Sequence, residues 1–405
     1  MTSWTSRAPA ADEPEPDDAA AEAPEDKVTN FELFFDLVYV FTLTQITQYM
    51  VRVHSGVGIV RGILLLALAW FSWSAYAWLG NQARADLGVV RAGMAFAMSG
   101  VFVMALCVPE AWNDRSGGLY APVVLASAYL FVRCVHLIVY AKIAHGDRAL
   151  LRQIKMSWPP VLGGGALLIT GAAIGGSRQT ELMAAAIAVD WGGFYLTSRW
   201  GSWRIHSAKY FTERHNLFVI LAIGESLLAM GAATIGTNLD TPLLIAALLG
   251  IGTALGLWWL YFDLITLAVE DRLHHAERAT RLKLAVDAFG YGHFPIIAGI
   301  VLTALGIEGV VAHASDTKGL GAFSAWALSG GAALYLAGLV LFGWLTLRAW
   351  GTIRLVVVCL LLAWTGPATM LPPLAGSAGV AAILGGLAVF ETHRYRVLRD
   401  AVRAA

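Results

Sequence analysis

Charged residues are scarce in this sequence, and their scarcity argues against an ordinary soluble protein. Asp, Glu, Lys and Arg make up 14% of its 405 residues, whereas a typical soluble domain carries about 25%. Apolar residues reach 58%, and the mean hydropathy is +0.64. Acidic and basic residues are equal in number, so no net charge favours nucleic acid as a partner. We expect membrane lipids, and a small molecule or an ion, as partners instead.

Cysteine is nearly absent, and several catalytic signatures are missing. Cys107, Cys134 and Cys359 each lie alone in an apolar run, so neither a CxxC pair nor a zinc spacing is present. The sequence also lacks a Walker motif, an HExxH motif and a nucleophile elbow. We therefore expect no catalytic residue set, no metal site and no cofactor, and these absences weigh against an enzyme.

The first 27 residues lack any apolar segment. Residues 1–26 hold eight acids, four prolines and one base, Arg7, and such a composition cannot bury a core. We expect a disordered acidic tail over 1–27 and a short basic tail over 396–405. Because the start lacks the basic and apolar regions of a secretion signal, we expect the first membrane helix to direct insertion.

Long apolar runs fill the rest of the chain, residues 28–395. A helix needs about 20 residues to cross a bilayer, and twelve runs come near that length. They are 31–51, 57–79, 89–108, 119–141, 158–175, 181–199, 216–236, 242–266, 284–307, 324–345, 353–372 and 377–393. The sequence therefore predicts an all-α, polytopic transmembrane helix bundle of about twelve spans.

The Lys and Arg residues predict the orientation of this bundle. Alternate connections, beginning and ending with the two tails, hold 22 of them, whereas the other connections hold 5. Basic connections stay in the cytoplasm, so we expect both termini there.

Similar segments recur in the two halves of the membrane region. Trp73-Ser74-Ala75-Tyr76 resembles Trp258-Trp259-Leu260-Tyr261, and the first and seventh runs both open near a Glu, Glu32 and Glu213. The recurrence indicates either a parallel repeat of six plus six helices or chance similarity among apolar segments. The halves of such a repeat would be residues 28–200 and 205–395.

Glu225 is the main candidate for function, because a charge in hydrocarbon costs several kcal/mol unless it is paired, protonated or hydrated. Glu225 lies about 18 Å along the helix from Glu213. We therefore place Glu225 near mid-bilayer. Gly224 is expected to admit a close neighbour, and Ser226 to donate a hydrogen bond. Glu213 either balances the positive end of its helix or joins the ion-binding acids.

Two acids share a face at the start of the first run. Thr29 and Glu32 have the spacing of a capping box, and Asp36 follows one turn later on the same face. Glu32 and Asp36 are predicted to hold a cation or share a proton, or else to bind an Arg or Lys from a neighbouring loop.

Arg133 and His136 share a face of the fourth run. We interpret Arg133 as the one arginine well inside a span. It stays charged and needs an acid or water nearby, so we expect Asp190 or Glu225 beside it. The pair would be either a static link between helices or a relay that switches with substrate or protons.

The ninth run contains residues that disturb a helix. The segment Gly290-Tyr291-Gly292-His293-Phe294-Pro295 predicts a kink or a break, and interrupted helices often line transporter sites. His293 can titrate near neutral pH and, with Tyr291, is predicted to border a substrate. The alternative is a packed, tilted helix with a hydrogen-bonded histidine.

Three segments resemble the bacterial low temperature requirement protein A (LtrA) family. They are Asn30–Phe41, Glu213-Arg214 with Ile220–Ser226, and Tyr291–Pro295 with Ala298–Val301. Where this family often has a histidine, three residues before the Glu-Arg pair, this sequence has Tyr210. The resemblance implies a multi-pass protein of the bacterial inner membrane, linked by name to growth in the cold. It implies no particular reaction or substrate.

We therefore predict a proton- or cation-coupled secondary transporter of a small solute. Glu225 and Asp190 would take up the ion, with Arg133 as a competing counter-charge. Two alternatives stay open: a regulatory or scaffold protein of the membrane, whose charges are structural, and a membrane-embedded enzyme acting on lipid. In the enzyme, His136 and His293 would do acid–base work.

Overall fold

The computed structural model describes residues 27–200, 203–263 and 265–396. The predicted tails, apart from Lys27 and Arg396, lie outside these residues. Within the described ranges the chain forms helices and connections without a strand, which confirms the all-α prediction. The α-helices are α1 (Asn30–Val53), α2 (Gly56–Gly80), α3 (Gly88–Cys107), α4 (Ala121–Ile143), α5 (Arg148–Ile174), α6 (Gly176–Trp200), α7 (Ala208–Ala233), α8 (Thr241–Phe262), α9 (Ile265–His275), α10 (Arg278–Leu284), α11 (Phe294–Ala312), α12 (Ala322–Ala325), α13 (Gly331–Leu347), α14 (Thr352–Met370) and α15 (Pro373–Arg394).

Most of these helices are long and apolar enough to cross a membrane. Among the described residues, 10 helical stretches meet both conditions. The other two predicted spans, 31–51 and 181–199, correspond to α1 and α6, which have 24 and 25 residues but carry more polar side chains. The polytopic bundle is therefore confirmed, while the count of twelve spans stays a prediction.

Side-chain caps explain where several helices begin. The predicted capping box is present, because Thr29 Oγ1 accepts from the Glu32 amide and the Glu32 carboxylate accepts from the Thr29 amide. Asp147, Ser207 and Asp240 likewise accept hydrogen bonds from first-turn amides of α5, α7 and α8. Each cap satisfies amide groups that have no partner inside the helix.

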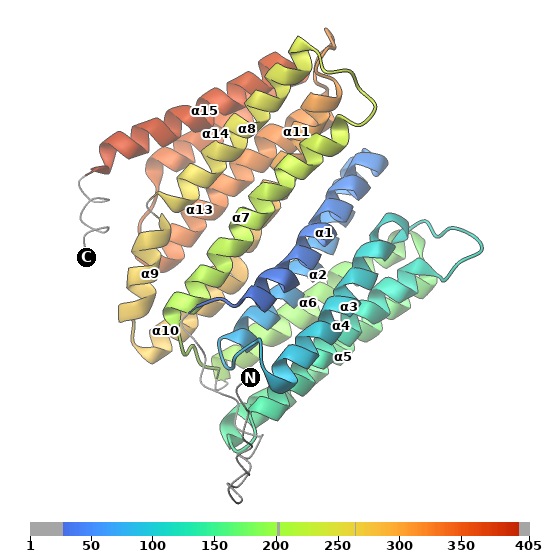
Figure 1. The fold of residues 1–405 in the computed structure, drawn as a ribbon, viewed down its shortest axis with the longest axis vertical. Coiled ribbons are helices and arrows are strands. Elements are labelled where there is room, and N and C mark those ends of the chain that lie inside the picture. The colour runs from blue at the N-terminus through green and yellow to red at the C-terminus, as the bar shows by residue number, and fades with distance from the viewer. Residues whose placement is uncertain (1–26, 201–202, 264, 397–405) are drawn as a thin grey trace, which may run out of the picture.

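The helices form two groups, one from α1 to α6 and one from α7 to α15 (Figure 1). Within the first group, α1 packs on α3, α3 on α4, α4 on α5, α5 on α6, and α2 on α6. Within the second, the matching contacts join α7 to α11, α11 to α13, α13 to α14, α14 to α15, and α8 to α15. The same packing order therefore occurs twice along the chain.

The two groups meet where α1 and α2 pack against α7 and α11. Aromatic side chains fill this junction: the Trp73 ring lies 5.1 Å from that of Trp70 and 4.2 Å from that of Phe218, between centroids. All three are buried. The largest side chains of the core thus lie where the two groups touch.

The predicted disturbance near Gly290 is a π-helix and not a break. Residues Ala285–Gly292, called η2, are π-helical, and one helical stretch runs through them from Arg278 to Ala312. π-helical turns inside α-helices are frequent at functional sites. A second π-helical segment, η3 (Trp326–Gly330), precedes α13 and was not expected from the sequence.

The end of α2 is clamped to the segment that precedes α7. The Asn81 side chain is fully buried; its Nδ2 donates to the Ser207 carbonyl and its Oδ1 accepts from the His206 amide, both at 2.7 Å. Gln82 Nε2 donates to the Arg204 carbonyl at 2.6 Å. These hydrogen bonds hold the connection between the two groups against the first of them.

Candidate functional site

The first cluster of buried charges, the Arg214 cluster, consists of Glu32, Asp36, Trp73, Tyr210 and Arg214. Asp36 accepts hydrogen bonds from Arg214 Nη1 and, at 2.8 Å, from Trp73 Nε1. Asp36 and Arg214 are both fully buried, and each lies in the second turn of its helix. Because the first turns of α1 and α7 lie together, the two helices run parallel at the junction between the groups.

Glu32 has two roles in this cluster. One carboxylate oxygen accepts from the Thr29 amide and hydroxyl, both at 2.9 Å, and the other accepts from the Tyr210 hydroxyl. The second oxygen also lies 3.7 Å from Arg214 Nε. The cluster thus holds two carboxyl groups against one guanidinium, so one proton or one cation would balance its charge.

The partner of these acids comes from a helix and not from a loop. Arg214 was expected at the cytoplasmic start of its span, but α7 begins at Ala208 and buries the arginine completely. The interpretation of Arg133 as the one arginine well inside a span is therefore wrong. Arg354 of α14 is a further buried arginine, paired with Glu391 of α15 at 2.7 Å.

The second cluster, the Arg133 cluster, lies inside the first group and consists of Phe71, Tyr129, Arg133, His136 and Asp190. Arg133 donates to both oxygens of Asp190, at 2.9 Å and 3.1 Å, and the Tyr129 hydroxyl donates to Asp190 at 2.7 Å. The guanidinium also lies 4.7 Å from the Phe71 ring centroid. The structure therefore brings Arg133 to Asp190 and not to Glu225, which lies on a helix of the other group.

His136 lies one turn from Arg133 and is buried. It lines a cavity of about 20 Å³ with Arg133, Ser74, Ser157 and Trp203, among others. A space of that size holds about one water molecule. Neither ring nitrogen of His136 has a hydrogen-bond partner among the residues the structure describes.

The third cluster, the Glu225 cluster, consists of Thr47, Gln48, Glu225 and Glu308 and lies where α1, α7 and α11 meet. Glu225 is fully buried, and within the described part of the chain neither of its oxygens has a hydrogen-bond partner. The Thr47 hydroxyl is close enough to interact with Glu225, but its proton is donated to the Leu43 carbonyl at 3.2 Å. Glu308 is near enough for the two charges to interact. Gln48 Nε2 donates to one oxygen of Glu308 at 2.8 Å.

Two expectations about the surroundings of Glu225 are wrong. Ser226 does not bond to Glu225, because adjacent helix residues point in different directions. A Cβ added at Gly224 would meet nothing within 4 Å, so no neighbour approaches closely there. Glu225 also lies nearer the Ala233 end of α7 than the Ala208 end, because the helix begins earlier than predicted.

The fourth cluster, the His293 cluster, consists of His215, Tyr261, Phe289 and His293. His293 directly follows η2 and is fully buried. Its Nδ1 lies 3.2 Å from the Ala288 carbonyl and its Nε2 2.8 Å from the Tyr261 hydroxyl. Because a carbonyl can only accept, Nδ1 donates to Ala288. The Tyr261 hydroxyl, which bonds to Nε2, also donates to Asn216 Oδ1 at 3.2 Å. The His215 ring lies 5.3 Å away.

Tyr291 and Glu213 lie outside these clusters. The Tyr291 hydroxyl donates to the Trp191 carbonyl at 2.6 Å and so links η2 to α6, on the side of the first group. Glu213 is half-buried, and its strongest charged neighbour is Lys209, one turn earlier in α7. Glu32 is buried, so the two acids matched by the sequence recurrence have different surroundings.

Several residues of these clusters were not identified from the sequence. Trp73, Tyr129, Arg214 and Tyr261 bond to the candidates through their side chains. Gln48 bonds to Glu308, which lies near Glu225. Gln48 and Glu308 offered a signal, since both are polar residues near the ends of apolar runs. The tyrosines and tryptophans offered none, because such residues are common at span ends.

Comparison with known proteins adds family information. A family model described as bacterial low temperature requirement A protein (LtrA) matches residues 27–389. An uncharacterized protein of Rhizobium meliloti (strain 1021) is 29% identical over 318 residues, which cover 76% of this chain and 75% of the relative. No solved structure matches the chain.

Proposed function

The chain belongs to the bacterial low temperature requirement A (LtrA) family of membrane proteins, and we propose that it is a secondary transporter coupled to protons or another cation. Its substrate would be a small solute. The proposal places the protein in the inner membrane with both termini in the cytoplasm, as the distribution of basic residues favours.

The observation that carries this proposal is the unpartnered carboxyl group of Glu225. An ionised carboxylate in a dry interior costs several kcal/mol when no donor or cation compensates it. Glu308 adds a second acid nearby, and Gln48 donates to Glu308 alone. Such a pair favours a neutral form of Glu225, reached by binding a proton or by sharing a cation with Glu308.

The position of the Glu225 cluster supports coupling to movement. It lies at the junction of the two helix groups, to which α1, α7 and α11 all contribute. The repeated packing order supports a parallel repeat of six plus six helices, and transporters built from repeats bind ions and substrates at the repeat interface. Movement of one group against the other would expose Glu225 to water and allow exchange.

The remaining clusters take other roles in this proposal. The Arg214 cluster joins α1 to α7 near the beginning of both helices. In this proposal it would carry a second proton or cation. Asp190 is saturated by Arg133 and Tyr129, which favours a static link within the first group. His293 borders the junction through Trp70, whose ring stacks at 6.3 Å.

Reconstitution tests the proposal. Purified protein in liposomes with a trapped pH-sensitive dye would be given an imposed membrane potential and a panel of cations, organic acids, organic bases and sugars. We expect proton or cation movement that depends on one of these solutes, and at least a tenfold loss in Glu225→Gln. In detergent, the wild type should also bind more protons than Glu225→Gln when titrated.

Glu181→Gln is the matched control, because Glu181 is an exposed acid paired with Arg178 at 2.8 Å. It should behave as the wild type in both assays. Equal flux and equal proton binding in wild type and Glu225→Gln would contradict the proposal.

The saturated Arg133–Asp190 pair favours a second candidate, a regulatory or scaffold protein. In that case buried charges only hold helices together, and removing Asp190 would lower the amount of folded protein. Wild-type protein that moves no proton, cation or solute in liposomes, together with a lowered abundance of Asp190→Asn, would favour this candidate over transport. Loss of flux at normal abundance would exclude a purely structural role for this residue.

A further inference from the structure

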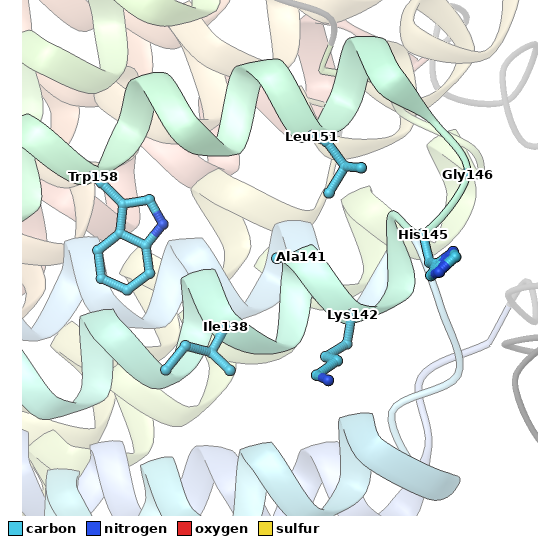
Figure 2. A pocket seen from close by; sticks show the side chains of 7 residues that line it. All are labelled: Ile138, Ala141, Lys142, His145, Gly146, Leu151 and Trp158. Carbon is cyan, nitrogen blue, oxygen red and sulfur yellow. The ribbon is translucent and has the colours of Figure 1, made fainter.

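An open groove runs between the end of α4 and the start of α5. Its volume is about 460 Å³, and its lining residues are Ile138, Ala141, Lys142, His145, Gly146, Leu151 and Trp158. Figure 2 shows Leu151 and Trp158 on α5, Ala141 between the two helices, and Lys142 and His145 near the connecting turn. The groove is therefore polar at the turn and apolar along the helices.

The polar end carries positive charge. Lys142 and His145 are both exposed; Lys142 lies in the last turn of α4, and His145 lies in the turn that follows Ile143. Gly146 in the connecting turn has a φ of 93°. A Cβ added there would contact nothing within 4 Å, so the turn does not block the groove.

The single acid between Lys142 and Trp158 does not cancel this charge. Asp147 accepts from the Ala149 and Leu150 amides at 3.0 Å and pairs with Arg204 at 3.0 Å. Its carboxylate is thus committed to the start of α5 and to the chain before α7. The acid nearest to Lys142 in this stretch of the chain is therefore already paired and does not compete with an anion that enters the groove.

The apolar end continues into the membrane. Trp158 lies about 15 Å along α5 from Arg148. Ile138 of α4 is 51% exposed. In a chain that spans a membrane, an exposed isoleucine next to a half-buried tryptophan contacts lipid, and tryptophan favours the boundary between headgroups and hydrocarbon.

We propose that this groove binds an anionic phospholipid of the leaflet that the basic connections face. The phosphate group lies against Lys142 and His145, and one acyl chain lies along Ala141, Leu151 and Trp158. Charge complementarity selects an anionic headgroup, since each lysine near a membrane surface contributes about fivefold in affinity for anionic lipid. The site does not depend on transport.

Lipid titration of the purified full-length chain tests the site. Delipidated protein in detergent would be titrated with phosphatidylglycerol or phosphatidylcholine, and binding followed by native mass spectrometry and by thermal unfolding. We expect phosphatidylglycerol to bind more tightly and to raise the unfolding temperature more. Lys142→Gln should weaken phosphatidylglycerol binding about fivefold and leave phosphatidylcholine binding unchanged.

Two further variants make the result decisive. Ala141→Phe fills the groove without changing charge, so it should weaken the binding of phosphatidylglycerol as well. Lys209→Gln removes an exposed lysine outside the groove and should bind lipid as the wild type does. Equal affinity for both lipids, or equal loss in Lys142→Gln and Lys209→Gln, would overturn the proposal. Unchanged binding in Ala141→Phe would overturn it too.

Discussion

Arg214 of α7 donates to Asp36 of α1 in an ion pair that is fully shielded from solvent. The pair joins the two helix groups, whereas the Arg133–Asp190 pair lies within one of them. Since the Glu225 cluster also joins α1 to α7, the junction carries buried ionisable groups towards both ends of these helices.

Breaking the Asp36–Arg214 pair should destabilise the protein strongly. Asp36→Asn removes the carboxylate that Arg214 Nη1 contacts, and Glu32, 3.7 Å from Arg214 Nε, compensates the buried guanidinium only in part. Removing one partner of a buried ion pair costs up to about 3–5 kcal/mol. We expect a marked fall in unfolding temperature in detergent and in yield. The double variant Asp36→Asn with Arg214→Gln should recover part of the loss, and a single variant as stable as the wild type would contradict this account.

Glu225→Gln should have the opposite effect on stability. Glu225 is buried without a hydrogen-bond partner in the described residues, so replacing it by a neutral side chain of the same shape removes no bond and lowers a desolvation cost. We expect an unfolding temperature equal to or above that of the wild type at pH 8. A loss comparable to that of Asp36→Asn would show that Glu225 has a structural partner.

Gly306→Ala should disrupt the packing of α11 on η3. A Cβ at Gly306 would overlap the backbone of Leu328, and backbone cannot move aside as a flexible side chain can. Overpacking of this kind costs about 1–3 kcal/mol. Thermal unfolding measures the effect, with Gly252→Ala as the control, because a Cβ at Gly252 meets nothing within 4 Å.

Asp147 should make the stability of the protein depend on acid pH. Hydrogen bonding from the Leu150 amide, helped by nearby Arg204, lowers the pKa of this carboxyl group. A lowered folded pKa means that its stabilisation is present above the unfolded value of about 3.9 and is lost as pH falls through the folded value.

The measurement is thermal unfolding of Asp147→Ala against wild type at several pH values. Loss of the cap should cost about 1 kcal/mol at pH 7, and the difference should shrink below pH 4. Asp147→Asn keeps a capping oxygen, so it should stay closer to wild type at neutral pH and show no such convergence. A constant difference at all pH values would exclude the charged form as the cause.

Sequence reasoning predicted the helical membrane fold well because it depends on composition and run length. A chain with long apolar runs and few charges must satisfy its backbone hydrogen bonds inside the membrane, and a helix bundle does so. The capping box at Thr29 and Glu32 was also predictable, since its partners are three residues apart. The beginning of α7 was not, because polar residues between Ser207 and Asn216 resemble a connection yet pack inside the bundle.

Partners in the buried clusters depend on how distant helices pack, and one sequence does not determine that. Asp190 was one of two acids expected beside Arg133, the other being Glu225. Arg214 was missed because it precedes the predicted run 216–236. The surroundings of Glu225 were predicted from its chain neighbours, Gly224 and Ser226, but its actual neighbours come from α1 and α11. Neighbours in the chain point elsewhere on a helix.

The clamp formed by Asn81 limits how the two helix groups can move. Its amide group accepts from the His206 amide and donates to the Ser207 carbonyl, and breaking two hydrogen bonds of a buried side chain is costly. Sliding of the second group along the first would break them, whereas rotation about that point would keep them. If the two groups move as the proposed transport requires, Asn81 would act as the pivot, and the largest displacements would occur at the far ends of the helices.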